Sequence, residues 1–307
     1  MANDDKGPAA DLWSNWLLHG RDAGDGKLRQ TVHERVDGYV DRLLEGARLA
    51  PGDILADIGS GEGHVAFRAI ERVGPTLRVC LSDVSEPMLR HAEASALERG
   101  VRGQCTFVQC SADRLEGMND ASFDVVTTRS VLAYVHDKTA ALREFLRVLK
   151  PGGRISLAEP VMQDDALAAR AMKAVIDSKP PQGVSPLMVL LHRWKAAQYP
   201  DTEEKIRLSP LANYSERDLV RFAQNVGFTD IHLELHIDIV PQIVHTWDAF
   251  INSSPHPLAP SLSAIMAGQF TAAERELFER SMRPVLEDPK SVSTDRMLYL
   301  TARKPLP

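Results

Sequence analysis

Residues 57–64 read DIGSGEGH and follow the apolar stretch 54–58, which has the length of a buried strand. Three glycines in a turn between a strand and a helix let a ligand touch the backbone, because they carry no Cβ. His64 stands where a dinucleotide fingerprint has its third glycine, and no Lys-Ser or Lys-Thr pair completes a phosphate-binding loop. Taken alone, the glycine-rich sequence is consistent with a cofactor site. It is equally consistent with a tight turn that only allows the following helix to pack closely.

Apolar and amphipathic stretches alternate on both sides of this turn. We expect strands at 54–58, 77–82, 106–109, 123–128 and 154–158, separated by helices. Helical stretches at 163–178 and 186–199 interrupt the pattern, which resumes with a helix at 215–227 and strands at 231–240 and 297–302. Capping boxes at 215–218 and 271–274 mark two helix starts. The pattern predicts an α/β fold with a doubly wound, mostly parallel seven-stranded sheet and helical cap inserts.

The same pattern divides the chain into six segments. A helical lid carrying Trp13 and Trp16 at helical spacing comes first. The predicted division is a lid at 1–49, a ligand-binding core at 50–160, a cap insert at 161–212, a core helix and strand at 213–240, a second helical insert at 241–290 and a last core strand at 291–307.

Composition narrows the class of protein. The 307 residues carry a formal charge of −6, which disfavours a sequence-independent grip on nucleic acid. The odd set Cys80, Cys105 and Cys110 suits a reducing compartment. Residues 1–11 lack the basic and apolar regions of a signal peptide, and no apolar stretch reaches membrane-spanning length. We expect a soluble cytoplasmic protein, monomeric or homodimeric, with no nucleic-acid or membrane partner.

Three carboxylates follow successive predicted strands. Asp57 lies under the glycine turn, Asp83 ends the second strand and Asp113 follows the third. A carboxylate at the second position can accept both hydroxyls of a ribose, and one at the third can accept from an adenine amine. Each acid alone could cap a helix or turn. Together, at the carboxyl ends of neighbouring strands, they favour a nucleoside site.

These residues resemble the class I S-adenosylmethionine-dependent methyltransferases of the ubiquinone/menaquinone-biosynthesis type, which have a Rossmann-like sheet. The resemblance covers about residues 50–160 and includes SEPML at 85–89, SFDVV at 122–126 and LRVLKPGG at 146–153, with weaker support at 226–228. It implies S-adenosylmethionine as cofactor, S-adenosylhomocysteine as product and no metal. The positions that it assigns to the cofactor are Asp57, Gly59, Ser60, Gly61, Gly63, Asp83, Val84, Met88, Ala112, Asp113, Arg129 and Ser130.

Two of these positions have an equally ordinary explanation. Met88 would pack on the adenine face, but a methionine there is nearly as often plain core. Arg129 follows the fourth strand, where relatives line the methionine portion and face the acceptor, and it could instead form a surface salt bridge.

The cap segments are expected to select the methyl acceptor. They hold the bulky and polar side chains that we assign to the acceptor pocket, namely Trp13, Trp16, Met162, Met188, His192 and Trp247. The alternative is that these side chains form the cap's own small core. The predicted catalytic groups are Tyr134, Glu159 and His19, of which a base is needed only if the acceptor must lose a proton.

The predicted activity is methyl transfer, by in-line displacement, to an O, N or electron-rich C atom of a small aromatic or apolar molecule of the natural-product type. Alignment and exclusion of water would supply most of the rate. The alternative is a methyltransferase-fold protein that binds the cofactor without transferring methyl, as a cyclase or a ligand-binding module. A nicotinamide-dependent oxidoreductase is disfavoured by His64.

Overall fold

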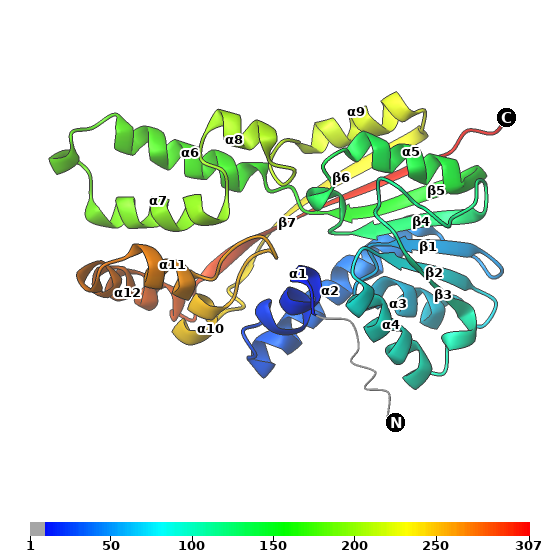
Figure 1. The fold of residues 1–307 in the computed structure, drawn as a ribbon, viewed down its shortest axis with the longest axis horizontal. Coiled ribbons are helices and arrows are strands. Elements are labelled where there is room, and N and C mark those ends of the chain that lie inside the picture. Colours follow the sequence, from blue (N-terminus) through cyan, green and yellow to red (C-terminus); the bar gives the residue numbers. More distant parts are fainter. Residues whose placement is uncertain (1–9) are drawn as a thin grey trace, which may run out of the picture.

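A seven-stranded sheet with the order β3-β2-β1-β4-β5-β7-β6 forms the centre of the computed structural model, which describes residues 10–307 (Figure 1). The strands are β1 (Ile54–Ile58), β2 (Arg78–Asp83), β3 (Cys105–Gln109), β4 (Phe123–Arg129), β5 (Leu149–Glu159), β6 (Thr229–Pro241) and β7 (Val292–Arg303). Pairing is parallel from β3 to β5, and β7 runs antiparallel to both β5 and β6. The predicted fold class is therefore confirmed.

Helices cover both faces of the sheet and form a separate group at one side of it (Figure 1). They are α1 (Leu12–Asn15), α2 (Gly26–Ala47), α3 (His64–Val73), α4 (Glu86–Glu98), α5 (Lys138–Val148), α6 (Gln163–Asp177), α7 (Pro186–Gln198), α8 (Glu203–Leu208), α9 (Glu216–Val226), α10 (Trp247–Asn252), α11 (Leu262–Gln269) and α12 (Ala272–Leu286). None of the helices in residues 10–307 combines the length and apolar character needed to cross a membrane.

Each sheet face has its own apolar layer. Val125 and Val126 are adjacent in β4 and fully buried, yet they belong to different layers, because successive strand residues point to opposite faces. Val125 packs in the layer with residues of α2, α3 and α4, and Val126 in the layer with residues of α5 and α9. Burial on both faces explains why the central strands are continuously apolar.

Predicted helix starts agree with the structure where side-chain caps are present. Ser215 and Asp218 form a capping box at α9, and Thr271 and Glu274 form one at α12. The Ser85 hydroxyl accepts the backbone N–H of Met88 and begins α4.

Several boundaries differ from the prediction. β5 begins at Leu149, because the Pro-Gly-Gly segment at 151–153 forms an irregularity within the strand, with Gly152 at φ +76°. β6 nearly matches the predicted strand at 231–240, whereas β7 begins at Val292, five residues before the predicted strand at 297–302. The N-terminal helix is one α turn followed by a π-helical turn, Trp16–Gly20. The predicted lid includes residues 1–9, which lie outside the described part of the chain, and the six-segment division stays a prediction.

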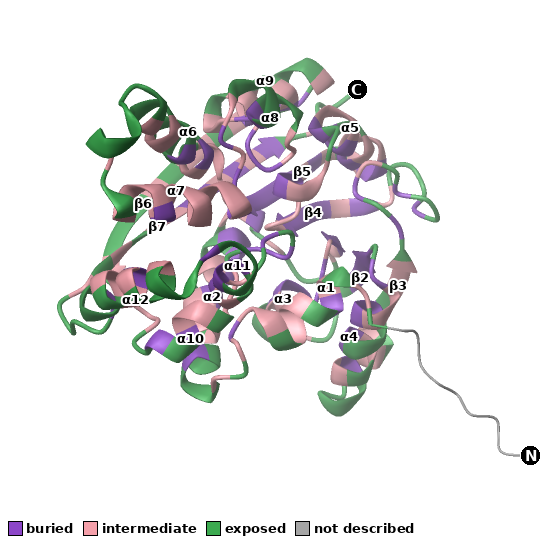
Figure 2. Ribbon diagram, turned by 60° about the vertical axis from the view of Figure 1, so that its left-hand side comes forward, coloured by how far each residue is buried: buried purple, intermediate pink, exposed green. Residues whose placement is uncertain are grey.

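The helices beyond the sheet have an apolar core of their own. α7, α10, α11 and α12 enclose a cluster that contains Leu190, Trp247, Phe270 and Phe278. Figure 2 shows mostly exposed and intermediate residues in this group, whereas purple buried segments concentrate in the sheet. These four helices therefore form a layer beside the sheet that has its own apolar core.

Candidate active site

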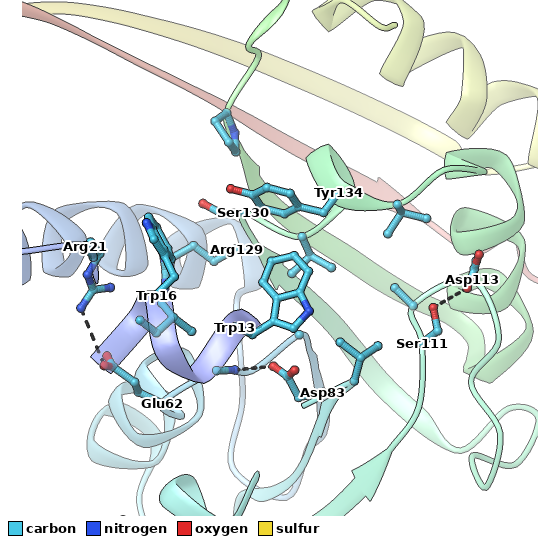
Figure 3. A pocket seen from close by; sticks show the side chains of 18 of the residues that line it. Trp13, Trp16, Arg21, Glu62, Asp83, Ser111, Asp113, Arg129, Ser130 and Tyr134 are labelled. Carbon is cyan, nitrogen blue, oxygen red and sulfur yellow. Dashed lines mark hydrogen bonds and ion pairs between the residues drawn. The ribbon is translucent and has the colours of Figure 1, made fainter. Parts of the chain in front are cut away.

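A cavity of about 480 Å³ opens at the carboxyl ends of the strands, between the sheet and the α1 segment (Figure 3). Loops after β1, β2, β3 and β4 line one side, with Gly61, Asp83, Ala112 and Arg129 among them. Trp13 and Trp16 from the N-terminal helical turns line the other side. Such a volume lies in the usual range for small-molecule sites, and this edge of a parallel sheet is where such ligands bind.

Asp83 is held rigidly at the end of β2. Its Oδ2 accepts the Gly61 backbone N–H at 2.9 Å, and its Oδ1 accepts the Ser85 backbone N–H at 2.9 Å. Each oxygen keeps a second lone pair for another donor. Burial raises the pKa of this carboxyl. The side chain lines the cavity and can accept hydrogen bonds from a ligand.

Gly59 requires the absence of a side chain. Its φ is +65°, and a Cβ there would lie 2.4 Å from Cγ2 of Val131 in the loop after β4. The two loops can therefore approach only because residue 59 is glycine. At Gly61, with φ +52°, a Cβ would point toward Leu17 Cδ1 at 3.5 Å and narrow the cavity instead.

Asp57 lies beneath the glycine turn and is 1% exposed. Its Oδ1 accepts the Thr127 hydroxyl at 3.1 Å, while its Oδ2 has no hydrogen-bond partner. Burial raises its pKa to about 7, partly offset by the Thr127 bond and by Arg129. The Ser60 hydroxyl is also buried without a partner. Unpaired buried acceptors under an open turn fit a ligand that brings N–H donors or positive charge.

The loops after β2 and β3 bring both apolar and polar residues to the cavity. Val84 is 45% exposed although it is apolar, and both Val84 and Ala112 line the cavity. Asp113 also lines the cavity and accepts the Ser111 hydroxyl at 2.5 Å. An aromatic base could pack between the apolar groups and reach Asp113 with an amine.

The aromatic side of the cavity is built from segments far apart in the chain. The Trp13 ring meets the Tyr134 ring edge-on, with centroids 5.0 Å apart. The Trp16 indole N–H donates to the Ser254 carbonyl at 3.2 Å and its hydroxyl at 3.0 Å. The N-terminal helical turns are therefore attached both to the core and to the second insert, and Met162 and Pro255 also line the cavity.

Arg129 faces the cavity from the end of β4 (Figure 3). In the described part of the chain no carboxylate forms an ion pair with it, and burial and the nearby Arg21 lower its pKa. Arg21 is by contrast paired with Glu62 at 3.7 Å. The expectation of a surface salt bridge at Arg129 is therefore not met, and this guanidinium is available to an anionic or electron-rich ligand group.

Glu159 supports the loop after β4 from below. It is fully buried, accepts the Thr128 hydroxyl at 2.6 Å and accepts the Val131 backbone N–H at 2.9 Å through Oε2. Burial raises its pKa to about 7. It does not line the cavity, so in this structure it fixes the loop backbone at Val131 rather than meeting an acceptor. Burial also raises the pKa of Tyr134, whose neutral hydroxyl can donate a hydrogen bond.

Several predicted site residues lie elsewhere in the structure. Met88 is a fully buried residue of α4, and Gly63 precedes α3 against the Phe67 ring. Trp247 belongs to the cap core, because α10 turns its ring toward Phe250 and Phe278. The members of the predicted set that do not line this cavity are Asp57, Ser60, Gly63, Met88, His19, Glu159, Met188, His192 and Trp247.

The remaining predicted residues of the lid and cap lie away from the cavity for local structural reasons. His192 Nε2 pairs at 3.2 Å with Asp201, in the loop before α8. His19 is exposed on the π-helical turn, and Met188 is half-buried in α7 near the cap core. Their predicted roles in acceptor binding or catalysis therefore have no support from position.

Sequence reasoning missed some lining residues. Arg21, Glu62 and Leu17 come from the lid and the glycine turn, and Pro255 comes from the second insert. Leu17 shares the helical spacing of Trp13 and Trp16, which was a usable signal. Arg21 lies in a stretch with loop composition, and nothing in the sequence indicated that Pro255 would meet the first helix.

Comparisons with known proteins agree with this geometry. A family model described as a methyltransferase domain matches residues 50–200. The ubiquinone/menaquinone biosynthesis C-methyltransferase UbiE of Pseudomonas paraeruginosa is 33% identical over 184 residues, which cover 58% of this chain and 70% of that protein. The chain belongs to the class I S-adenosylmethionine-dependent methyltransferases, whose cofactor is S-adenosylmethionine.

More particular similarities cover parts of the chain. UbiE of Pseudomonas putida is 36% identical over 148 residues, 47% of this chain and 57% of that protein, so the match spans little more than half of that relative. Nocamycin O-methyltransferase of Saccharothrix syringae is 34% identical over 203 residues, 64% of this chain and 66% of that protein. The YcgJ protein of Bacillus subtilis shares the fold, with a TM-score of 0.51 and 17% identity over 88% of this chain and all of that one.

Proposed function

We propose that the protein transfers a methyl group from S-adenosylmethionine to a nucleophilic atom of a small, apolar or aromatic molecule. The observation that carries the proposal is a single cavity with two unlike sides. Asp83, Gly61 and Asp113 offer a nucleoside site at the strand ends, and Trp13 and Trp16 of the lid form an aromatic enclosure together with Tyr134 from the loop after β4. A cofactor and an acceptor bound there would share one space from which water is largely displaced.

The residues present fit the cofactor. The open lone pairs of Asp83 would accept the ribose hydroxyls, and the bare backbone at Gly61 would lie along the methionine portion. Asp57 lies beneath the turn, and its unpaired Oδ2 would stabilise the positively charged ammonium group of the cofactor. The cofactor supplies a methyl group on a positively charged sulfur. The chain's own residues bind, align and enclose the two reactants.

The acceptor atom stays open between oxygen, nitrogen and carbon. The named relatives include a C-methyltransferase and an O-methyltransferase, so similarity favours neither. An acceptor of the natural-product type suits the aromatic enclosure. The neutral Tyr134 hydroxyl would orient an acceptor oxygen or nitrogen by hydrogen bonding.

The unpaired Arg129 guanidinium would bind a carboxylate or an acidic hydroxyl. That group could belong to the cofactor or to the acceptor. Arg129→Gln separates the two sources: weaker binding of S-adenosylhomocysteine in calorimetry assigns it to the cofactor, whereas a raised KM for the acceptor at unchanged affinity assigns it to the acceptor.

Incubation with methyl-labelled S-adenosylmethionine and a panel of small phenols, enols, amines and indoles tests the activity. We expect labelled product and stoichiometric S-adenosylhomocysteine with at least one acceptor class. Cofactor binding without turnover, also with extracts of small metabolites, would favour the non-transferring alternative.

A further inference from the structure

β6 is an edge strand of the sheet, and its residues are unusually exposed to solvent. It has 13 residues, and none of them is buried. One edge pairs with β7. The other edge has no strand partner in residues 10–307, so its backbone N–H and C=O groups face outward. An edge of this length is a template for a further strand.

The outward half of β6 also exposes an apolar row. Leu235, Ile237 and Ile239 are 41%, 57% and 65% exposed and share one face, because they alternate along the strand. Edge strands are usually protected by charge, proline or a covering element, and a run of exposed apolar side chains marks an interaction site.

Charged and titratable residues alternate on the opposite face. They occur in the order His232, Glu234, His236 and Asp238, and Glu234 already attracts Arg42 and both histidines within its own chain. In an antiparallel copy the series runs in the opposite direction, so that each acidic residue lies opposite a histidine. The strand is therefore complementary to an antiparallel copy of itself, with each carboxylate opposite an imidazole that can donate a hydrogen bond to it.

We propose that β6 pairs antiparallel with β6 of a second copy, about a two-fold axis at Leu235. The polar face then matches His232 with Asp238 and Glu234 with His236, each twice. The apolar face matches Leu235 with itself and Leu233 with Ile237. The two sheets become one continuous sheet, in an isologous homodimer.

Neighbouring registers are less favourable. Shifting the axis by one residue to His236 places Glu234 opposite Asp238, and shifting it to Glu234 places that carboxylate opposite itself. Axes between residues would set apolar side chains against charged ones. The regular pairing of β6 with β7 begins at His232, after an irregularity at 229–232, so the matched segment 232–238 is regular strand.

This inference does not depend on the proposed activity, because β6 contributes no side chain to the cavity. The first test is the mass of the full chain by light scattering and sedimentation at about 50 μM. We expect a dimer. Leu235→Arg sets two positive charges against each other at the axis and should give a monomer. Val285→Arg is the control, since Val285 is a similarly exposed apolar residue on α12, and it should stay dimeric.

Cysteine cross-linking tests the register. Directly opposed residues have Cα atoms about 4.5–5.5 Å apart, within disulfide range, so Leu235→Cys should cross-link in diamide. The two copies of Ile237→Cys would be about 13 Å apart and should not. The native cysteines are buried and do not compete. A monomeric wild type, a Leu235→Arg protein that stays dimeric, or preferential cross-linking at 237 would overturn the proposal.

Discussion

The two sides of the cavity are held in different ways. On the sheet side, Asp83 and Glu159 are fixed by backbone N–H groups of adjacent loops, and the supporting side chains are buried. On the lid side, Trp16 is fixed by a bond to Ser254, 238 positions away in the chain. The sheet side is preorganised by local structure, whereas the lid side depends on distant segments closing together.

Gly59→Ala should break the sheet side and have the largest effect. The new Cβ would meet Val131 at 2.4 Å in a left-handed conformation, so we expect a loss of roughly 2–4 kcal/mol in unfolding free energy and no measurable binding of S-adenosylhomocysteine. Gly103→Ala is the control, because nothing lies within 4 Å of its added Cβ. Thermal unfolding and calorimetry measure both quantities. Normal binding by Gly59→Ala would contradict the close approach of the two loops.

Asp83→Ala tests the nucleoside site on the same side. Removing an acceptor from two buried hydroxyls should weaken S-adenosylhomocysteine binding by roughly 1–3 kcal/mol. Calorimetry with an analogue that lacks the ribose hydroxyls is the matched control. The analogue should bind wild type weakly and lose little more in the variant, because the hydroxyl–carboxylate bonds are already absent. An equal loss for both ligands would mean that Asp83 acts only by holding Gly61 and Ser85.

Asp57→Asn separates stability from binding. The folded-state pKa of Asp57 is about 7, above its ordinary 3.8, so the folded protein takes up a proton that the unfolded chain lacks between these values. The unfolding free energy contributed by this group therefore falls as pH rises from about 4 to 7 and stays low above. We expect Asp57→Asn to stabilise the ligand-free protein by roughly 1–3 kcal/mol at pH 8 and little at pH 4.

The same substitution should weaken binding of S-adenosylhomocysteine at pH 8, because the charged carboxylate favours the ligand's ammonium group. In wild type, the thermal shift produced by this ligand should grow between pH 5.5 and pH 8. Asp177→Asn on exposed helix surface is the control. A ligand-induced shift independent of pH would show that Asp57 does not couple to the site.

The difference between the two sides of the cavity also explains which site residues could be predicted from the sequence. Asp83 and Asp113 could be assigned to the cavity because strand ends of a parallel sheet converge on one edge, whatever the rest of the chain does. Trp247 and His192 could not be placed, because helical spacing shows that a face is apolar and not which neighbour it meets. The structure turns Trp247 into the cap core and ties His192 to Asp201.

Tyr134 and Glu159 show that the direction of a side chain cannot always be predicted even at the strand ends of the sheet. Both follow strands at the predicted edge, but only Tyr134 lines the cavity. Glu159 is turned beneath the loop by its bonds to Thr128 and Val131. Whether a side chain at a strand end points into the cavity or under a neighbouring loop depends on packing between loops, which the sequence does not display.

The smallest effect should come from the lid side, through Trp16→Phe. This change keeps an aromatic ring but removes the N–H that reaches Ser254, so roughly 0.5–1.5 kcal/mol of lid attachment is lost. Hydrogen exchange should accelerate at residues 12–21 and stay unchanged at 57–63, with S-adenosylhomocysteine affinity preserved. Ser254→Ala removes one of the two acceptors and should give a smaller change. The double variant should be less than additive if the two residues act through one contact, since coupled neighbours deviate from additivity. Faster exchange at 57–63 as well would mean that the two sides are not independent, and that closing of the lid also orders the cofactor loop.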